Sequence, residues 1–527
     1  MFKEKKRSQH EPRAASLLKK IELDFSKMPV LHSPSLDSDQ HSVQDSTSDH
    51  QNQISKLRST ELLKSVCTNI YKKGFMNGLF SDITVSALGM QYHLHKLILI
   101  QSPYFASMLE GSWKEQDQSL IELQLEDPHL TVESLTIMFA RLYGETQSKI
   151  SLKNATSLLA AGVFFDDSSL CELAVEFVTQ HMDPHSVVEY LMFSDNFDYG
   201  SYSQSIKDAC LAFICSRDFK DLVPILSRLP FDWLSRFVSC DCLNVASEFQ
   251  RYKLITNVLD ERESLSETSE IGSTLEESLN DLDICVESTQ DDMDTLFKNA
   301  VVFTNMSFEE LEQVRDEGIV SDEILKDALW EQKQTELQIK KKSLLKSETE
   351  DERTVKASPV FIPQLDTDKM NKRDISQRIM APPIHSIATH SPPFRFAVEF
   401  KDLDQITDRL YSEPVWYAGS YWRSYVQMPI GSEQKLGIYL QRLVSFSSAF
   451  PRDSHPYMDH RESVGAWFQI YGFLSNACYL LESRPDQFKD NQSWGWQSQT
   501  LYKELVLQKG KHLKCAIIIG LAEYLKS

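Results

Sequence analysis

Residues 81–109 decide the fold of the first half of the chain; they read SDITVSALGMQYHLHKLILIQSPYFASML. The first five of these residues alternate polar and apolar side chains, which is typical of a half-buried strand. Gly89 then provides a turn before a second extended segment, residues 92–95. Further on, apolar side chains recur at helical spacing and form one face of a helix. They are Leu97, Ile98, Phe105, Met108 and Leu109. The stretch therefore predicts a small domain that mixes strands and helices.

The same mixture of elements continues on both sides of this stretch. Residues 120–125 alternate again like a strand, and residues 131–142 and 153–180 have helical periodicity. Before the first strand, apolar side chains follow one another at helical spacing. They are Leu62, Leu63, Val66 and Ile70. We therefore expect one α/β domain over residues 58–180.

An ordered set of motifs in this domain resembles the BTB/POZ family. The motifs are Ser81-Asp82-Ile83, His95-Lys96, Leu99 and Ser102-Pro103-Tyr104-Phe105 followed by Met108. Leu94 departs from the family pattern, in which small residues are commoner at that place. The resemblance implies a homodimer formed through the first helix, about residues 60–78. The potassium-channel tetramerisation domain shares the fold and stays an alternative, although no channel segment follows.

Residues 181–259 are expected to be helical almost throughout, and they resemble the all-α BACK domain that often follows a BTB domain. The matching pieces are Leu234, Ser239-Cys240-Asp241, Leu243, Val245 and Ser247-Glu248. The next residues contain thirteen acidic side chains and one basic side chain between Asp260 and Thr295. Such self-repulsion opposes packing, so residues 260–296 are predicted to be a disordered insertion.

The helical region is expected to resume after this insertion and to continue over residues 297–342. Ser307 and Glu310 have the spacing of a capping box that begins a helix, and Gly318 is suited to end it. Residues 343–393 carry mixed charge and six prolines, and they are interpreted as a linker.

The last block, residues 394–527, holds five of the eight tryptophans and alternates polar and apolar side chains in several short segments. This pattern predicts an antiparallel β-sandwich. The block resembles the MATH (TRAF-like) domain in Ser412-Glu413-Pro414-Val415-Trp416, Gly419 with Trp422, Pro429, Gly431, Leu436-Gly437-Ile438-Tyr439-Leu440, Trp467, Ser493-Trp494-Gly495-Trp496 and Leu505. Known MATH-BTB adaptors place MATH first, so their peptide-groove residues cannot be transferred here. We expect the sandwich to fold and bind independently of the BTB domain.

Composition restricts the partners of the chain. Its 527 residues carry a net charge of −21, which disfavours direct binding of nucleic acid. No run of about 18 apolar residues predicts a membrane span. Residues 1–57 are polar and are predicted to be a disordered tail; their Lys3–Arg7 cluster is either a nuclear address or a solvated tail. Nine cysteines without a repeating frame indicate reduced thiols, hence the cytoplasm, the nucleus or both.

No catalytic, cofactor-binding or metal-binding motif is evident. His93 and His95 alternate on a strand without a further ligand, so they are expected to be core or surface residues. Cys240 and Cys242 lack the spacing of a zinc pair and a partner pair. Cys171, Cys210 and Cys215 lie on helical segments and are expected to be small core residues. We therefore expect a non-catalytic protein without a cofactor.

The BTB resemblance implies a substrate adaptor of a cullin-three-type RING ubiquitin ligase. In BTB proteins that bind this cullin, an apolar residue, any residue and then Glu follow the Ser-Pro-Tyr-Phe helix. Trp113-Lys114-Glu115 stands at that place, so Trp113 and Glu115 are predicted to contact the cullin, together with Phe105 and Met108. An exposed loop is the alternative interpretation of the three-residue pattern.

A target protein is expected to be recruited by the C-terminal sandwich for degradation. Trp416 and Tyr417 are its candidate substrate-binding residues, because aromatic side chains dominate binding hot spots. The alternative is that either residue completes the core of the sandwich. The rival hypothesis is a BTB scaffold or transcription-associated protein that does not bind a cullin.

Overall fold

The computed structural model describes most of the chain beyond the N-terminal tail. The described residues are 62–110, 118–145, 150–270, 290–344, 371–372, 375–383, 392–403, 408–428, 434–443, 457–474, 476–483, 485–507 and 512–522. The described residues from Cys67 onward form one compact unit, and residues 62–66 belong to a separate N-terminal unit. None of the helices among the described residues is both long and apolar enough to cross a membrane.

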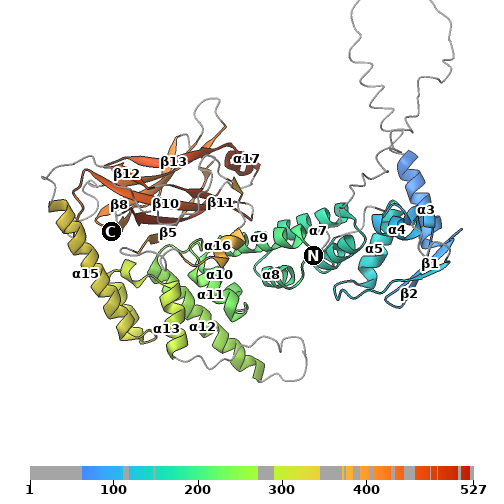
Figure 1. Cartoon of the computed structure of the whole chain (residues 1–527), viewed down its shortest axis with the longest axis horizontal. Helices are drawn as coiled ribbons and strands as arrows, with labels where there is room; N and C mark the ends of the chain where they lie inside the picture. Colours follow the sequence, from blue (N-terminus) through green and yellow to red (C-terminus); the bar gives the residue numbers. More distant parts are fainter. Residues whose placement is uncertain are drawn as a thin grey trace, which may run out of the picture. The chain divides into compact units, whose positions relative to one another are not determined.

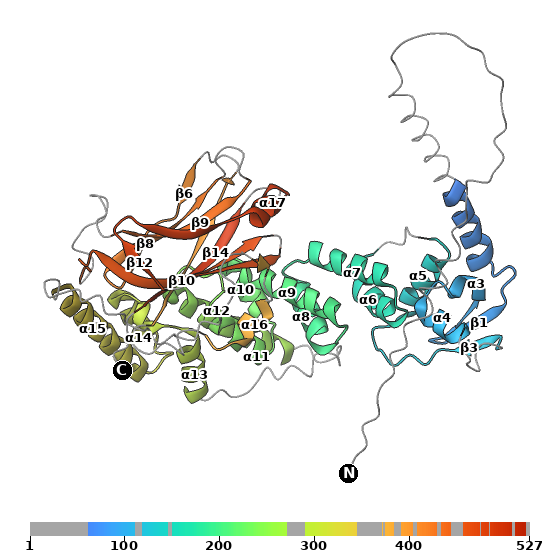
Figure 2. The ribbon, with the colours of Figure 1, turned by 45° about the horizontal axis from the view of Figure 1, so that its top comes forward.

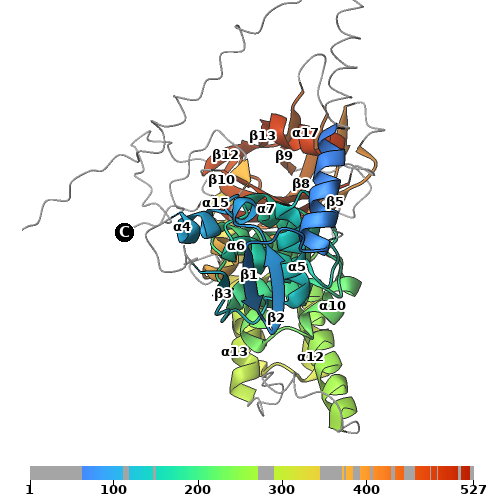
Figure 3. The same cartoon turned by 90° about the vertical axis from the view of Figure 1, so that its right-hand side faces the viewer.

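The first domain is built around a three-stranded sheet. In this sheet β1 (Ile83–Ala87) lies between the antiparallel β2 (Met90–Leu94) and the parallel β3 (Leu120–Glu122), as Figure 3 shows. The alternation predicted for β1 is confirmed, because Ile83, Val85 and Ala87 are buried. The helices of the domain are α3 (Lys96–Leu99), α4 (Pro103–Leu109), α5 (Val132–Leu142), α6 (Ala155–Phe164) and α7 (Ser168–Gln180). The helix before β1 comprises residues 62–69 and continues as the π-helical η2 (Ile70–Met76).

A helical region follows this domain, as expected. Its elements are α8 (Val187–Asn196), α9 (Ser201–Cys215), α10 (Phe219–Leu226), α11 (Phe231–Ser239), α12 (Glu248–Glu270), α13 (Gln290–Ala300), η4 (Phe303–Asn305), α14 (Phe308–Glu317) and α15 (Asp322–Leu344). The predicted capping box is confirmed, since Ser307 and Glu310 bond each other's backbone N–H. Gly318 ends α14 in the left-handed conformation, with a φ of 67°.

The predicted bounds of the acidic insertion, residues 260–296, are too wide. α12 continues to Glu270 and α13 begins at Gln290. On α13, Leu296 and Phe297 are buried in the core of the helical region, so apolar anchors near the edge of the charged segment override the local charge repulsion. Residues 271–289 lie outside the described residues.

The C-terminal block forms two antiparallel sheets (Figures 1 and 2). One has the order β4-β11-β10-β14-β5 with β12 beside β10, and the other has the order β13-β9-β8-β6 with β7 beside β8. Their bounds are β4 (Asn371–Lys372), β5 (Phe394–Phe400), β6 (Arg409–Tyr411), β7 (Val415–Tyr417), β8 (Ser420–Gln427), β9 (Leu436–Leu443), β10 (Ser463–Leu474), β11 (Ala477–Glu482), β12 (Asp486–Lys489), β13 (Ser493–Ser498) and β14 (Leu513–Leu521), with α17 (Gln499–Leu507) between the last two. Both sheets share one core, in which Trp422 is fully buried.

The expectation of a simple linker over residues 343–393, and of a sandwich independent of the rest, does not hold. Within this range β4 pairs with β11, and α16 (Ile375–Met380) buries Ile375 and Ile379 in the core of the helical region. That core also contains Trp467 and Ile518 from the sheets. The two regions therefore share a hydrophobic core. The proline content of residues 343–393 gives no indication of this packing.

Candidate functional site

The predicted dimerisation helix exposes apolar side chains. Leu62, Leu63, Val66, Ile70 and Met76 are 67%, 64%, 45%, 39% and 63% exposed. Solvent-facing apolar side chains at helical spacing are typical of a surface that another chain covers. The exposed apolar side chains are compatible with self-association, and the homodimer stays a prediction.

The described residues among those predicted to contact a cullin differ in how far their side chains are buried. Phe105 is 0% exposed and stacks on Phe165 at a ring-centroid distance of 5.4 Å, so its side chain belongs to the domain core. Met108 is half-buried on the same helix, α4. Trp113 and Glu115 lie outside the described residues, and their contact with a cullin stays a prediction.

His93 on β2 and His95, the residue that follows this strand, both have hydrogen-bond partners within the domain. His95 bonds the Tyr143 hydroxyl through Nδ1 and the Leu79 carbonyl oxygen through Nε2, each at 2.8 Å. His93 Nδ1 lies 3.2 Å from the Thr84 hydroxyl on the neighbouring strand. The His95 contact holds the segment after β2 against the end of α5, and the His93 contact joins β2 to β1.

The second candidate site is a half-open cavity of about 810 Å³ between α14, α15 and the β7 strand. Aromatic side chains form much of its wall: Phe308, Phe394, Trp416, Tyr417 and Tyr457. Carboxylates and one ammonium group complete it: Glu309, Glu310, Glu336 and Lys333. Both residues predicted to bind a substrate, Trp416 and Tyr417, line this cavity. A concave, mostly apolar site with a few polar groups has the features of a binding pocket.

Local contacts fix the sheet side of the cavity. Tyr417 donates its hydroxyl hydrogen to the Pro392 carbonyl at 3.1 Å, and its ring stacks on Phe394 at 5.4 Å. Tyr417 is only 5% exposed, so it shapes the wall, whereas Trp416 is half-buried. β7 and β8 are joined by the two residues 418 and 419, both with positive φ, as a type I′ turn requires.

The helix side of the cavity is held by Gln332 on α15. Its amide nitrogen donates to the carbonyl oxygens of Thr304 and Met306 at 3.0 and 2.7 Å. Because these carbonyls lie in the segment that leads into α14, one side chain fixes the spacing of the two helices. These hydrogen bonds join segments 26 and 28 residues apart, and no local sequence pattern reveals them.

The charge around the cavity is mainly negative. Glu336 is 9% exposed and accepts hydrogen bonds from Lys333 and Lys340 at 3.0 and 2.5 Å. Burial raises the pKa of Tyr457, and the negative charges of Glu336 and Asp459 raise it further. The Tyr457 hydroxyl is consequently neutral at physiological pH and is available as a hydrogen-bond donor or acceptor.

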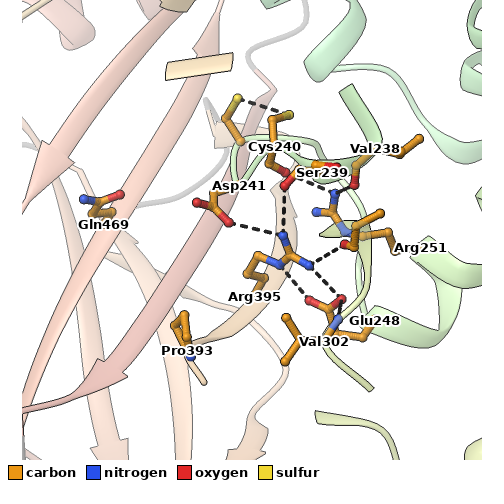
Figure 4. A network of polar contacts seen from close by, with 12 residues as sticks. Val238, Ser239, Cys240, Asp241, Glu248, Arg251, Val302, Pro393, Arg395 and Gln469 are labelled. Atoms are coloured by element: carbon orange, nitrogen blue, oxygen red, sulfur yellow. Dashed lines mark hydrogen bonds and ion pairs between the residues drawn. The ribbon is translucent and has the colours of Figure 1, made fainter. Parts of the chain in front are cut away.

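A buried ion pair joins the sheet that carries β5 to the helical region (Figure 4). The Arg395 guanidinium donates to both carboxylate oxygens of Glu248 at 2.7 and 2.8 Å and to Asp241 at 3.2 Å. It also donates to the carbonyl oxygens of Ser239 and Ala300. Burial alone would lower the pKa of Arg395, but the charge of Glu248 raises it above its ordinary value. The sequence offers one signal for this pair: an arginine in the apolar strand Phe394–Phe400.

Comparison with known proteins decides the nature of the first domain, since residues 71–182 match the BTB/POZ domain family. The chain contains a BTB/POZ domain. Germ cell-less protein-like 1 of Homo sapiens is 33% identical over 166 residues, which cover 32% of this chain and 31% of that relative. Kelch-like protein 28 of Mus musculus is 27% identical over 192 residues, 34% of this chain and 32% of that protein.

BTB/POZ domain-containing protein 2 of Schizosaccharomyces pombe is 28% identical over 234 residues, which cover 41% of this chain and 82% of that relative. The chain thus matches about a third of the length of the human relative. At the level of the domain family these matches indicate protein–protein interaction, and they indicate no catalytic family. The BACK and MATH resemblances lie beyond the matched family.

Proposed function

We propose that this protein is a substrate-recognition adaptor of a cullin-three-type RING ubiquitin ligase. The BTB/POZ domain forms the homodimer and binds the cullin through Met108, Trp113 and Glu115, with Phe105 supporting the helix from the core. The cavity at Trp416 and Tyr417 receives the target protein. The adaptor acts in the cytoplasm, the nucleus or both.

The observation that supports this proposal most is the combination of a BTB/POZ domain with a separate aromatic cavity on one compact unit. An adaptor needs two binding surfaces that do not compete. Dimerisation would present two target sites to one scaffold pair, and linked binding of this kind raises avidity by roughly 10²–10⁴ without new contacts.

The cullin contact is tested by capture of the cullin on the purified full chain. Trp113→Ala is expected to weaken capture by roughly 30- to 1,000-fold, since truncation of a buried aromatic anchor costs about 2–4 kcal/mol. Trp330→Ala is the matched control, because Trp330 is 66% exposed on α15, outside the BTB domain. Equal capture by the Trp113 variant and the parent would leave the rival hypothesis, a BTB scaffold that binds no cullin. Loss of the dimer in that variant would assign Trp113 to the fold.

The target site is tested by Trp416→Ala in cells, compared with Trp494→Ala as the control. Trp494 is 38% exposed on β13 and does not line the cavity. Proteins whose ubiquitylation depends on the adaptor should accumulate with the Trp416 variant and not with the control, while cullin capture is retained. Unchanged target levels with retained cullin capture would exclude the cavity as the target site.

A further inference from the structure

Three cysteine side chains meet in the core beside the Arg395 ion pair. Cys215 is the last residue of α9, and Cys240 and Cys242 lie in the segment between α11 and α12. The Sγ atom of Cys242 lies 3.7 Å from that of Cys215 and 3.6 Å from that of Cys240. All three Sγ atoms lie within 4.8 Å of one another, and the residues are 0–3% exposed.

The separations of 3.6 and 3.7 Å are close to those of a metal–thiolate site, and the third pair of sulfur atoms lies within 4.8 Å. Zinc–sulfur bonds are about 2.3 Å long, so two thiolates on one tetrahedral ion lie about 3.8 Å apart. The three sulfur atoms could therefore bind one ion with little movement. The local sequence around Cys240 and Cys242 lacks a partner pair, which disfavours zinc, but the fold supplies Cys215 from a helix 25 residues before Cys240.

The segment that carries two of the thiols is held on both sides. Arg251, 2% exposed, donates from Nη1 to the carbonyl oxygens of Val238 and Cys240 at 2.7 and 3.1 Å. The backbone N–H of Asn244 donates to the Cys215 carbonyl at 2.9 Å, which ties the segment to the end of α9. Backbone contacts therefore bring the three thiols together before any ion binds.

One cation, Arg251, lies against the segment that carries two of the thiols, since it donates to the Cys240 carbonyl oxygen. The other charged groups around the cluster, Glu248, Asp241 and Arg395, are already engaged with one another. The positive charge of Arg251 would offset part of the negative charge of bound thiolates, and positive neighbours favour cysteine as a metal ligand.

We propose that Cys215, Cys240 and Cys242 bind one thiophilic d¹⁰ cation, Zn²⁺ or Cu⁺, through three thiolates. On binding, three S–H bonds break, three metal–sulfur bonds form and three protons pass to solvent. Such an ion would connect the end of α9 to the segment that carries Asp241. It would thereby support the contact between the helical region and the β5 sheet.

The experiment measures zinc and copper in the full-length protein, purified without chelator from cells supplied with either metal. The wild type is expected to carry stoichiometric metal, and Cys242→Ser should lose it. Cys171→Ser is the matched control, since Cys171 is equally buried on α7 but outside the cluster. Whichever metal copurifies identifies the ion. Wild-type protein without either metal, or a Cys242 variant that retains its metal, would overturn the proposal.

A second measurement covers the case in which the Cys242 variant does not fold. X-ray absorption at the edge of the bound metal of the wild-type protein should show three sulfur neighbours at about 2.3 Å. Nitrogen or oxygen neighbours alone would place the metal elsewhere. A disulfide among the three cysteines in the freshly purified protein would equally exclude the site.

Discussion

Replacement of Arg395 by methionine should destabilise the contact between the helical region and the sheets. Methionine replaces the aliphatic part of the arginine side chain with an unbranched apolar one. It leaves the carboxylates of Glu248 and Asp241 without their cation. Both carboxylate side chains are buried, with 1% and 8% exposure. Removal of one partner from a buried ion pair typically costs about 3–5 kcal/mol, because the remaining charge is neither solvated nor paired.

Hydrogen exchange of the full chain measures this cost locally. Each 1.4 kcal/mol changes an opening equilibrium tenfold, so amides in β5 and at the start of α12 should exchange roughly a hundred to a few thousand times faster. Amides in β1 and β2 of the BTB domain should keep their rates. Arg315→Met is the control: Arg315 pairs with Glu312 and Asp316 on an exposed helix face, and exposed pairs contribute about 0–1 kcal/mol.

Two results would refute this reasoning. Unchanged exchange in β5 and α12 would show that the ion pair contributes no more than a surface pair. Equal acceleration everywhere, including the BTB sheet, would show that the variant unfolds globally and that the contact is not a local unit of stability.

Three further predictions follow from single positions. Burial alone would raise the pKa of Glu248, but the paired Arg395 holds this pKa below its ordinary value. The ion pair should therefore contribute its full stabilisation of the fold above about pH 4.5 and lose it as the pH falls further. Urea unfolding curves recorded between about pH 3 and pH 7 should show this loss. Gly419→Ala should lower the urea midpoint more than Gly89→Ala: both glycines have positive φ, but only the first would place a Cβ 2.8 Å from a backbone nitrogen. The full chain should sediment as a dimer at micromolar concentration, and Leu63→Asp should yield monomers whereas Val506→Asp, an exposed apolar position in the sandwich block, should not.

Local sequence patterns determined the elements whose stability depends on nearby residues. The alternation at residues 81–85 predicted β1, the Ser307–Glu310 spacing predicted the start of α14, and Gly318 predicted its end. The BTB/POZ domain was predictable for the same reason, because its motifs lie close together and in a fixed order. Trp416 and Tyr417 were chosen from their aromatic chemistry alone; both line the cavity, and their role in binding a target stays a prediction.

Tertiary structure decided the features that depend on distant partners. Arg395 meets Glu248 across 147 residues, and Cys215 meets Cys242 across 27, and no periodicity encodes such pairs. The same limit explains the error over residues 343–393, whose prolines indicated a linker although Ile375 and Ile379 are buried. A buried charge or apolar side chain is stable only against its partner, and that partner is chosen by the fold rather than by its neighbours in the sequence.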